Sequence, residues 1–578
     1  MPILLSLAVY YRGLSAWFQQ DDFAHLQLAA RTSLAGLPAM LLQPVAQGTF
    51  RPFSERGFYW TFYQLFGLEA APYRIACFLL HAGNCALLFA LLRRLSGSWW
   101  GASLGVAMWG VNPCLALPLT WVAATNQGLW AASVLGSVYL FVLFGESGQP
   151  RYLAGSWVVF LSGFGMLEGQ IAVPAILVAY AFLWNRARLL PACTYFVPAG
   201  LFAVLHLWLI PRKTTGAYAM DLGPGMWMSA VDYWRISWGF SAAAWIAALL
   251  LPILIWRGET RKLVCLGIVW WLALLGPVLP LQRHITDYYL TVPLMGVSAM
   301  AAAAFVIYPR LSATLGLAWI CAAAPVARAK AAEQVERSRN MEALVRGVAE
   351  VSHRFPRETI LLSGVNDRLF WSGIYDHPFP LVGRADVYLT PEAAAALTPY
   401  PDLFQARDYT LPSAVVTDLL DQRKAVVYTV PGRRLTQSTG IYARSRIVER
   451  GVARVDLGDP AFDRFLDTSW YGRENGFRWM PARASVTLSG EGRIVTVAGF
   501  CVPQQFRERT AIPVHAKWNG ADLGTQILRA GASQYTLQFV LPLQRDLNGT
   551  LTIEVASTMQ IPGDSRDLGL AVTRIAIR

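Results

Sequence analysis

Charged residues are scarce in this chain of 578 residues, and the few that occur are unevenly placed. Asp, Glu, Lys and Arg make up 15% of the sequence, against about a quarter in a typical soluble protein, while 55% is hydrophobic. Between Trp99 and Phe144 the only ionisable side chains are those of cysteine and tyrosine. This composition excludes an ordinary soluble protein and predicts an integral membrane protein.

Cysteine is also rare, and several catalytic motifs are missing. The seven cysteines have neither metal-ligand spacing nor the pattern of a disulfide framework. The sequence has no Gly-rich phosphate loop of the Walker type and no HExxH or CxxC motif, which disfavours an ATPase and a zinc protease. We expect most of the cysteines to be packing residues in or beside apolar segments: Cys77, Cys85, Cys114, Cys193, Cys265 and Cys321.

Long apolar runs dominate the first 327 residues. A helix needs about 20 mostly apolar residues to span a bilayer, and lipid cannot satisfy an open backbone. The runs therefore predict about eleven transmembrane helices, the first of them short: Met1–Tyr11, Tyr73–Leu92, Trp99–Leu117, Leu129–Phe144, Tyr152–Leu167, Gly169–Trp184, Leu189–Ile210, Ile236–Trp256, Leu263–Leu281, Tyr288–Tyr308 and Leu311–Ala327.

Basic residues in the short loops indicate the orientation. The net charge is +13, and we attribute much of it to these loops rather than to binding of nucleic acid. Short basic loops favour the cytoplasmic side. The loop from Trp17 to Pro72, the stretches Arg212–Tyr233 and Gln282–Asp287, and everything after Ala327 are then expected outside the cytoplasm. The basic residues concerned are Arg93, Arg94, Arg151, Arg186, Arg188, Arg257, Arg261, Lys262 and Arg310.

The remainder of the chain shows two different sequence patterns, which predict two water-exposed parts. Residues 328–470 begin with a helical pattern over Ala329–Phe355 and continue with strand-like runs, which predicts a small α/β segment. Residues 471–578 alternate in the manner of strands and predict a β-sandwich-like module, with tight turns at Asn519-Gly520 and Asn548-Gly549. The expected strands are Thr359–Leu362, Asp386–Leu389, Ala484–Leu488, Arg493–Ala498, Ile512–Trp518, Tyr535–Leu541, Thr550–Ala556 and Ala571–Ile577.

Aromatic and charged residues mix in Trp470–Glu474 and Phe477–Trp479, ahead of the expected strands that begin at Ala484. Two interpretations stay open. The aromatic rings either stack on sugars, which makes the module carbohydrate-binding, or they form the hydrophobic start of the sandwich.

Two adjacent carboxylates, Asp21 and Asp22, follow the first apolar segment in an aromatic setting. Apolar surroundings raise the pKa of a carboxyl, and a twin charge drives the two pKa values apart. The pair suits a general base, a ligand for a divalent metal ion, or both. The alternative is a helix cap, because Asp is favoured at helix N-termini and Phe23–Ala30 has a helical pattern.

Further polar residues lie in or beside the expected outer loops. Arg51 begins an Arg-Pro-Phe-Ser stretch and suits either a substrate phosphate or lipid headgroups. Glu168 separates two short apolar runs, where a carboxylate is costly unless it is exposed or functional. Arg283 and His284, in a short loop that runs into Tyr288, suit an anionic headgroup that is bound and released; the alternative is a solvated loop. His81 and Asn84 we assign to hydrogen bonds between helices.

The order of these motifs resembles the multi-span glycosyltransferases of the GT-C type, nearest to bacterial members related to protein O-mannosyltransferases. The likeness covers about the first 320 residues. It rests on the acidic pair and the Arg-Pro-Phe-Ser stretch, and then on Phe66-Gly67-Leu68, Tyr73, Leu79-Leu80-His81, Asn84, Trp121 to Trp130, Glu168 ahead of Pro174, and Arg283 to Pro293. A tetratricopeptide array, found in some relatives, is missing, which leaves the class of acceptor open.

The resemblance implies a reaction. Members of this family move a sugar from a polyprenyl-phosphate carrier to an acceptor hydroxyl on the non-cytoplasmic face, usually with inversion. Carried over, Asp21 or Asp22 is the base, while Arg283, with His284 and Arg51, neutralises the departing phosphate. Glu168 and Tyr288 are expected to line the substrate site. Some relatives use a divalent metal ion, for which Asp21 and Asp22 are the candidate ligands, and the expected location is a bacterial inner membrane.

Two other classes remain open at this stage. A transporter or flippase for a lipid-linked glycan predicts inverted repeats and ionisable residues within the helices. A non-catalytic membrane scaffold with a glycan-binding module predicts that loss of Asp21 and Asp22 leaves function intact.

Overall fold

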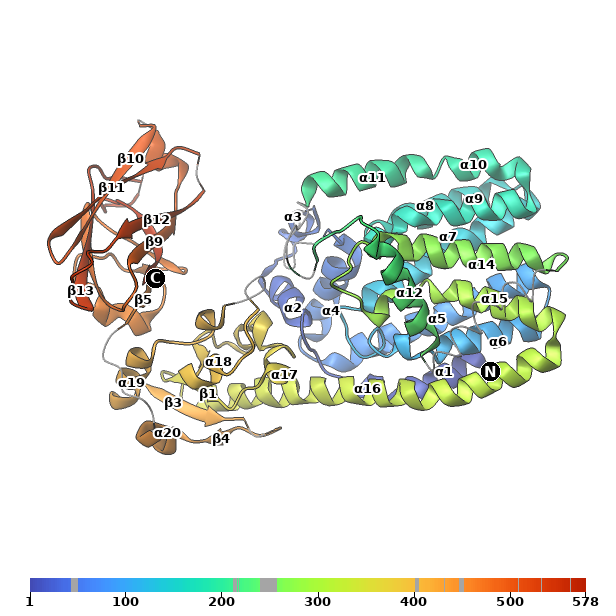
Figure 1. Ribbon diagram of the computed structural model, residues 1–578, viewed down its shortest axis with the longest axis horizontal. Coiled ribbons are helices and arrows are strands. Elements are labelled where there is room, and N and C mark those ends of the chain that lie inside the picture. The colour runs from blue at the N-terminus through green and yellow to red at the C-terminus, as the bar shows by residue number, and fades with distance from the viewer. Residues whose placement is uncertain are drawn as a thin grey trace.

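Three parts follow one another along the chain: a helical bundle, a small α/β unit and a β-sandwich (Figure 1). The computed structural model describes residues 1–42, 50–210, 216, 218–239, 257–400, 405–430, 432–445, 452–507, 509–531, 533–561 and 563–578.

The bundle consists mainly of apolar helices that run roughly parallel to one another (Figure 1). Its helices are α1 (Pro2–Tyr10), α2 (Asp22–Arg31), α3 (Leu37–Leu42), α4 (Phe58–Phe66), α5 (Ala70–Ser96), α6 (Trp99–Gly110), α7 (Thr125–Ser147), α8 (Pro150–Gly163), α9 (Val173–Trp184), α10 (Leu189–Cys193), α11 (Phe196–Leu209), α12 (Gly225–Trp238), α14 (Thr260–Leu275), α15 (Leu294–Ile307) and α16 (Pro309–Arg354). Short helical turns between them include η2 (Pro52–Gly57), η4 (Glu168–Ala172) and η7 (Asp287–Leu290).

Five helical stretches within the described residues are long and apolar enough to cross a bilayer. They are Ala70–Ser96, Thr125–Ser147, Arg186–Leu209, Thr260–Val278 and Pro309–Arg354, and each contains most of an expected span. Two more apolar helices, Glu168–Trp184 and Leu294–Ile307, are shorter. The expected span Ile236–Trp256 lies outside the described residues from residue 240 onward. The protein is thus a polytopic membrane protein, and the count of about eleven helices stays a prediction.

Polar groups inside the bundle join helices, as expected from the sequence. The His81 ring lies 2.7 Å from the Ser6 hydroxyl of α1, and the Asn84 amide donates to the carbonyl of Gly128 in α7. The seven cysteines are all free, and Cys77, Cys85 and Cys114 are buried. The hydrogen bonds from α5 to α1 and α7 confirm the interpretation of His81 and Asn84 as helix-joining residues.

The two ends of the bundle differ in chemistry. The junction of α9 with α10, the start of α14 and the junction of α15 with α16 lie together at one end (Figure 1). These are the connections that contain Arg186, Lys262 and Arg310. The acidic pair and α2 lie at the opposite end, next to the α/β unit (Figure 1).

Helix α16 joins the bundle to the α/β unit without a break. The sequence predicts a membrane span over Leu311–Ala327 and a separate helical stretch over Ala329–Phe355, but one helix of 46 residues contains both. At 1.5 Å per residue it is roughly 70 Å long. Pro325 lies inside it.

The α/β unit is built on a four-stranded sheet in the order β2-β1-β3-β4, with β1 parallel to both β2 and β3. Its apolar side chains do not form a separate core, because Met341, Phe370 and Ile374 share one cluster with Phe23 and Tyr59 at the end of the bundle. The elements are β1 (Thr359–Ser363), α17 (Asp367–Phe370), η8 (Ile374–Asp376), β2 (Val387–Leu389), α18 (Pro391–Ala395), η10 (Ala406–Asp408), α19 (Ser413–Asp421), β3 (Ala425–Thr429), β4 (Thr436–Gln437) and α20 (Thr439–Ser445).

The C-terminal part is a sandwich of two sheets, with strand orders β11-β10-β13-β8 and β12-β9-β14-β7-β6, and β5 also pairs with β14. The six strands expected after Ala484 are all present within a residue or two. The strands are β5 (Arg454–Asp456), β6 (Arg473–Glu474), β7 (Phe477–Trp479), β8 (Arg483–Ser489), β9 (Ile494–Phe500), β10 (Ala511–Trp518), β11 (Ala521–Arg529), β12 (Gln534–Val540), β13 (Asn548–Val555) and β14 (Ala571–Ile577).

Of the two tight turns predicted at Asn-Gly pairs, the structure contains one. Asn519 and Gly520 both have positive φ and connect β10 to β11, which confirms the first tight turn. The prediction of a turn at Asn548-Gly549 is wrong, because both residues lie in β13. Glycine is needed there for space: a Cβ on Gly549 would lie 2.2 Å from the ring of Trp518.

The aromatic residues ahead of the sandwich are part of its interior. Trp470 and Trp479 are only 7% and 4% exposed, and the Trp470 ring nitrogen donates to the carbonyl of Ser485. Of the two interpretations of this stretch, the structure therefore favours the hydrophobic start of the sandwich over a stacking surface for sugars.

Candidate active site

The acidic pair begins helix α2, where the bundle meets the α/β unit. Asp22 is the first residue of the helix and Asp21 precedes it. The residue before them, Gln20, has a φ of +53°, and its backbone N–H donates to the carbonyl of Ser372 in the α/β unit at 2.8 Å. Strained backbone of this kind persists where the surroundings hold it in place. The α/β unit therefore helps to fix the position of the pair.

Asp22 is an anchor for the surrounding backbone. It is fully buried, and its Oδ1 accepts from the Tyr59 hydroxyl at 2.5 Å and from the Ala123 N–H at 2.7 Å. Its Oδ2 accepts from the N–H of Gln19 at 2.9 Å. Burial raises the pKa of Asp22 to about 6, although Arg74 and these donors favour the ionised form. Both oxygens are thus occupied by protein donors.

Asp21 has different surroundings. It is partly exposed, and no other described residue donates a hydrogen bond to its carboxyl group. Burial raises the pKa of Asp21 to about 8, and the charges of Asp376, Asp22 and Glu55 add to this effect. Its charge also acts on the phenol of Tyr218. Among the described residues only the backbone N–H of Asp21 itself donates to this carboxyl, which leaves it room to accept a proton from a substrate, as a general base must.

Arg51 and Glu168, far apart in the sequence, form an ion pair. The Nε of Arg51 donates to both oxygens of Glu168 at 2.9 Å, and one terminal nitrogen donates to Glu55 at 2.6 Å. The backbone brings them together, since the N–H of Phe53 in η2 donates to the carbonyl of Gly165, just before η4. The guanidinium is thus shared by two carboxylates, and the three residues together carry one negative charge.

Arg283, His284 and Tyr288 lie along one loop but in different settings. Arg283 is exposed and has no ion pair with a described residue. The His284 ring lies 4.4 Å from the ring of Tyr218, and burial lowers the pKa of the imidazole. Tyr288 packs edge-on against Trp121 at 6.2 Å, and the charge of Arg51 acts on its phenol. Tyr218, whose phenol is influenced by the charges of Asp21 and Arg51, thus connects His284 to the site, and Tyr288 is within reach of the Arg51 charge.

Part of the site comes from the α/β unit, which sequence reasoning did not foresee. The side-chain amide of Gln27 in α2 donates to the carbonyls of Asp376 and His377 at 2.7 and 2.8 Å. The charge of Asp376 acts on Asp21 more strongly than that of Asp22 does. Nothing in the sequence relates Asp376 to Asp21, because the two are about 350 positions apart. Glu55 was also missed, although it directly follows the Arg-Pro-Phe-Ser stretch.

The seam between α2 and the α/β unit leads to a prediction. Gly373 has a φ of +155°, and a Cβ at this position would lie 2.2 Å from the Phe23 ring. In Gly373→Ala the new methyl group would overlap the Phe23 ring. In addition, alanine is strained at this φ, which lowers the stability by about 1 to 3 kcal/mol. We expect the purified variant to melt at a lower temperature than the wild type. Gly383→Ala is the matched control, since Gly383 also has a positive φ but open space around its Cβ. Equal melting of the two variants would contradict the tight seam.

The expected metal ligands, Asp21 and Asp22, belong to no larger cluster of metal-binding side chains among the described residues. Within the described part of the chain, no group of three or more His, Cys, Asp or Glu side chains is arranged to hold a metal ion. Asp22 directs both oxygens at hydrogen-bond donors, so binding a cation there requires those bonds to break.

Similarity to known proteins is found among solved structures. No protein-family profile and no curated protein matches the chain. The structure of ArnT from Cupriavidus metallidurans bound to undecaprenyl phosphate is similar over 77% of this chain and 94% of its own, with 12% identity and a TM-score of 0.41. ArnT is a GT-C glycosyltransferase, the class that the order of motifs resembles. At this identity and TM-score the likeness assigns neither a substrate nor the role of any residue.

Proposed function

We propose that this protein is a membrane glycosyltransferase of the GT-C type, which moves a sugar from a polyprenyl-phosphate carrier to an acceptor hydroxyl on the non-cytoplasmic face. The observation that carries the proposal is the carboxyl group of Asp21. It is a partly exposed acid with a strongly raised pKa, it has no donor from another described residue, and it lies among Tyr218, Glu55 and Asp376. Perturbed acids of this kind gather at functional sites.

Asp21, rather than Asp22, is the proposed base. A base must reach the proton that it removes, and the oxygens of Asp22 are buried and occupied by three donors. Asp22 instead holds the backbone of Gln19 and Ala123 in place around its neighbour. This division of roles gives the two carboxylates of the pair different chemical tasks.

The proposed transfer proceeds as follows. Asp21 accepts the proton of the acceptor hydroxyl, and the acceptor oxygen attacks the anomeric carbon. The bond from that carbon to the phosphate oxygen breaks, its electron pair leaves with the polyprenyl phosphate, and the configuration inverts. Arg283, exposed and unpaired among the described residues, is the proposed cation for the departing phosphate, since charge develops there. Arg51 is already neutralised by Glu55 and Glu168, and its proposed task is to shape the site.

The orientation of the chain supports the proposed face. The basic connections lie at the end of the bundle opposite to Asp21 and the α/β unit (Figure 1). Short basic loops favour the cytoplasm. The proposal therefore places Asp21 and both water-exposed parts on the outer side of a cell membrane, with a bacterial inner membrane as the expected one.

The test is consumption of a carrier-linked sugar. Membranes that contain the protein are compared with membranes from the same cells without it. Both are supplied with a panel of radiolabelled polyprenyl-phosphate sugars and a crude extract of acceptors. We expect label to leave the carrier only in the presence of the protein. If no sugar of the panel is consumed, the proposal fails, and the result favours a transporter or a non-catalytic scaffold instead.

The raised pKa of Asp21 predicts how transfer depends on pH. A carboxyl acts as a base only after losing its proton, and with a pKa of about 8 the ionised form is the minority below pH 8 and the majority above it. The rate at limiting acceptor concentration should therefore rise with pH through about 8 and then level off. A rate that is unchanged across this range would show that a different group, or Asp21 with an ordinary pKa, removes the proton.

A further inference from the structure

A groove on the β-sandwich is distinct from the site around Asp21. It has a volume of about 280 Å³ and is lined by residues of β9, β12 and β14: Ala498, Gly499, Phe500, Gln534, Tyr535, Thr536 and Thr573. On β9 and β12 the residues that pair across the strands are Phe500 with Gln534 and Ala498 with Thr536. Gln534 and Thr536 are exposed, so the groove is open to solvent on this face of the sheet.

The lining is polar but carries no charge. Gln534 offers an amide, Thr536 and Thr573 offer hydroxyls, and Phe500 offers a half-buried ring. Sugars present hydroxyl groups on their edges and C–H groups on a face, so they suit amides and hydroxyls beside an aromatic ring. A phosphate or carboxylate would meet no cation in this lining. The groove therefore suits a neutral saccharide, and its volume, near the lower end for ligand sites, suits one or two sugar units.

The groove is supported from behind. The Phe500 ring packs edge-on against Phe477 at 4.7 Å, which fixes its orientation. Thr573 lies at an irregularity in the pairing of β14 with β9, and its hydroxyl donates to the carbonyl of Ala498 at 3.1 Å. Bulges of this kind re-aim side chains and are frequent beside binding sites. The ring and the hydroxyl are thus held before a ligand arrives.

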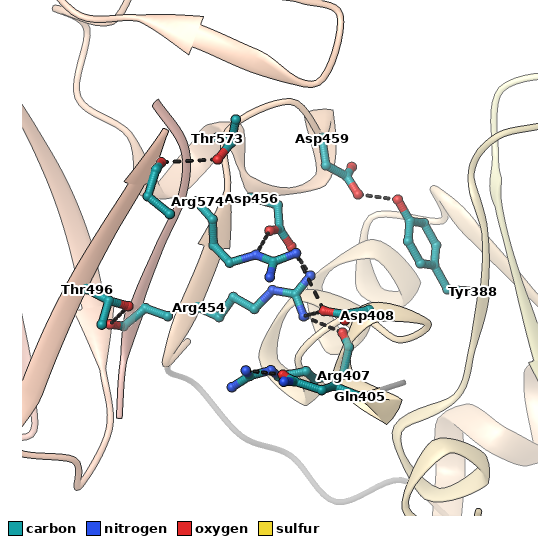
Figure 2. Close-up of polar contacts among 12 residues, drawn as sticks. Tyr388, Gln405, Arg407, Asp408, Arg454, Asp456, Asp459, Thr496, Thr573 and Arg574 are labelled. Carbon is teal, nitrogen blue, oxygen red and sulfur yellow. Dashed lines mark hydrogen bonds and ion pairs between the residues drawn. The ribbon is translucent and has the colours of Figure 1, made fainter. Parts of the chain in front are cut away.

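The groove also borders the joint between the sandwich and the α/β unit. Figure 2 shows Thr573 next to Arg574, whose guanidinium donates to Asp456 at 2.7 Å and lies 3.5 Å from Asp408 of η10. Arg454 lies between the same two carboxylates. Apolar residues of both parts, among them Val427 and Val497, form one continuous core across the joint. In Figure 1, β9 and β12 lie on the side of the sandwich toward the bundle.

From these observations we propose that the groove lined by β9, β12 and β14 is a binding site for a neutral saccharide. The joint holds this site in a fixed relation to the α/β unit, which in turn covers α2. A glycan chain bound in the groove is therefore held on the same side of the membrane as Asp21. This inference concerns binding by the sandwich and does not depend on the proposed transfer reaction.

The experiment uses the full-length protein in detergent and a panel of neutral disaccharides: maltose, cellobiose, lactose and mannobiose. Saturation-transfer NMR reports which sugar protons contact the protein. We expect a signal with at least one disaccharide for the wild type, and a signal reduced roughly tenfold or more for Thr536→Arg, which fills the groove with a long charged side chain. Glucose 6-phosphate should give a weaker signal than glucose, because the lining has no cation.

The matched control is Gln538→Arg. Gln538 is the next outward-facing residue of β12, is exposed like Thr536 and does not line the groove. It should retain the wild-type signal, which excludes a general effect of a new arginine on β12. The inference is overturned if no disaccharide of the panel gives a signal. It is also overturned if Thr536→Arg binds as well as the wild type, because the sugar is then held elsewhere, for instance near Asp21.

Discussion

Asp21→Asn is expected to reduce sugar transfer by about 10² to 10⁴-fold, the usual contribution of a positioned general base. Asparagine has almost the same size as aspartate, but its side-chain amide cannot accept a proton near neutral pH. No other described residue hydrogen-bonds the Asp21 carboxyl group, and its raised pKa destabilises the folded protein at neutral pH, so the variant should melt no lower than the wild type. Transfer of radiolabelled sugar from the carrier, measured at equal expression, gives the rate.

Asp22→Asn is expected to act on stability first. The Asp22 carboxylate accepts from three donors, and an asparagine turns one of its oxygens into an NH₂ group that faces an N–H or O–H. A buried donor without an acceptor costs about 1 to 3 kcal/mol. A lower melting temperature should therefore accompany any loss of rate.

The two variants separate the roles that the sequence left undivided. Glu350→Gln, at an exposed carboxylate of α16 whose charge does not act on Asp21, controls for the loss of one negative charge. The assignment of the base is reversed if Asp22→Asn melts normally and loses the rate while Asp21→Asn keeps it. If both variants transfer sugar at the wild-type rate, the base lies elsewhere.

Arg51→Ala is the second change with a large expected effect. Its guanidinium pairs with Glu55 and Glu168, and its removal leaves two carboxylates close together without a cation. Breaking a buried ion pair from one side costs about 3 to 5 kcal/mol. We expect the lower end, about 3 kcal/mol, because the side chains of Arg51 and Glu168 remain 21% and 23% exposed. Thermal unfolding in detergent measures the loss.

Arg94→Ala is the matched control for this prediction. Arg94 also pairs with a distant glutamate, Glu146, at 2.7 Å, but the two side chains are 38% and 43% exposed. Exposed pairs contribute about 0 to 1 kcal/mol, so this variant should melt close to the wild type. If Arg51→Ala melts as Arg94→Ala does, Arg51 is available to a ligand and does not maintain the structure. Adding Glu168→Ala to Arg51→Ala should recover part of the lost stability.

The sequence predicted the types of element well where a pattern is local. Apolar runs located the long helices, because span length and hydropathy are properties of one segment. Alternation located six strands of the sandwich, and positive φ at Asn519 and Gly520 follows from the residues themselves. Asn548-Gly549 has the same two letters but a different setting, since Trp518 packs over Gly549. Packing between strands overrode the local turn preference there.

The sequence predicts individual residues of the candidate site but not how they are grouped, because the grouping depends on packing between distant segments. Residue type and the family resemblance each point to single residues: Asp21, Arg51, Glu168, His284 and Tyr288. Their grouping depends on long-range contacts, such as the bond from Phe53 to Gly165 that carries Arg51 to Glu168. Asp376 had no signal at all, because it reaches the site through the fold of the α/β unit. The different surroundings of Asp21 and Asp22 likewise arise from Tyr59 and Ala123, which are distant in sequence.

The uninterrupted helix α16 sets the distance of the α/β unit from the bundle and its rotation about the helix axis. Each residue of an α-helix adds about 1.5 Å of length and about 100° of rotation. A single residue inserted between the bundle and β1 would therefore swing the α/β unit by more than a quarter turn, and Gly373 would no longer face Phe23. Seven residues would restore the angle approximately but lift the unit by about 10 Å, which breaks the bonds from Gln27. The length of α16 therefore decides whether the contacts between α2 and the α/β unit can form at all.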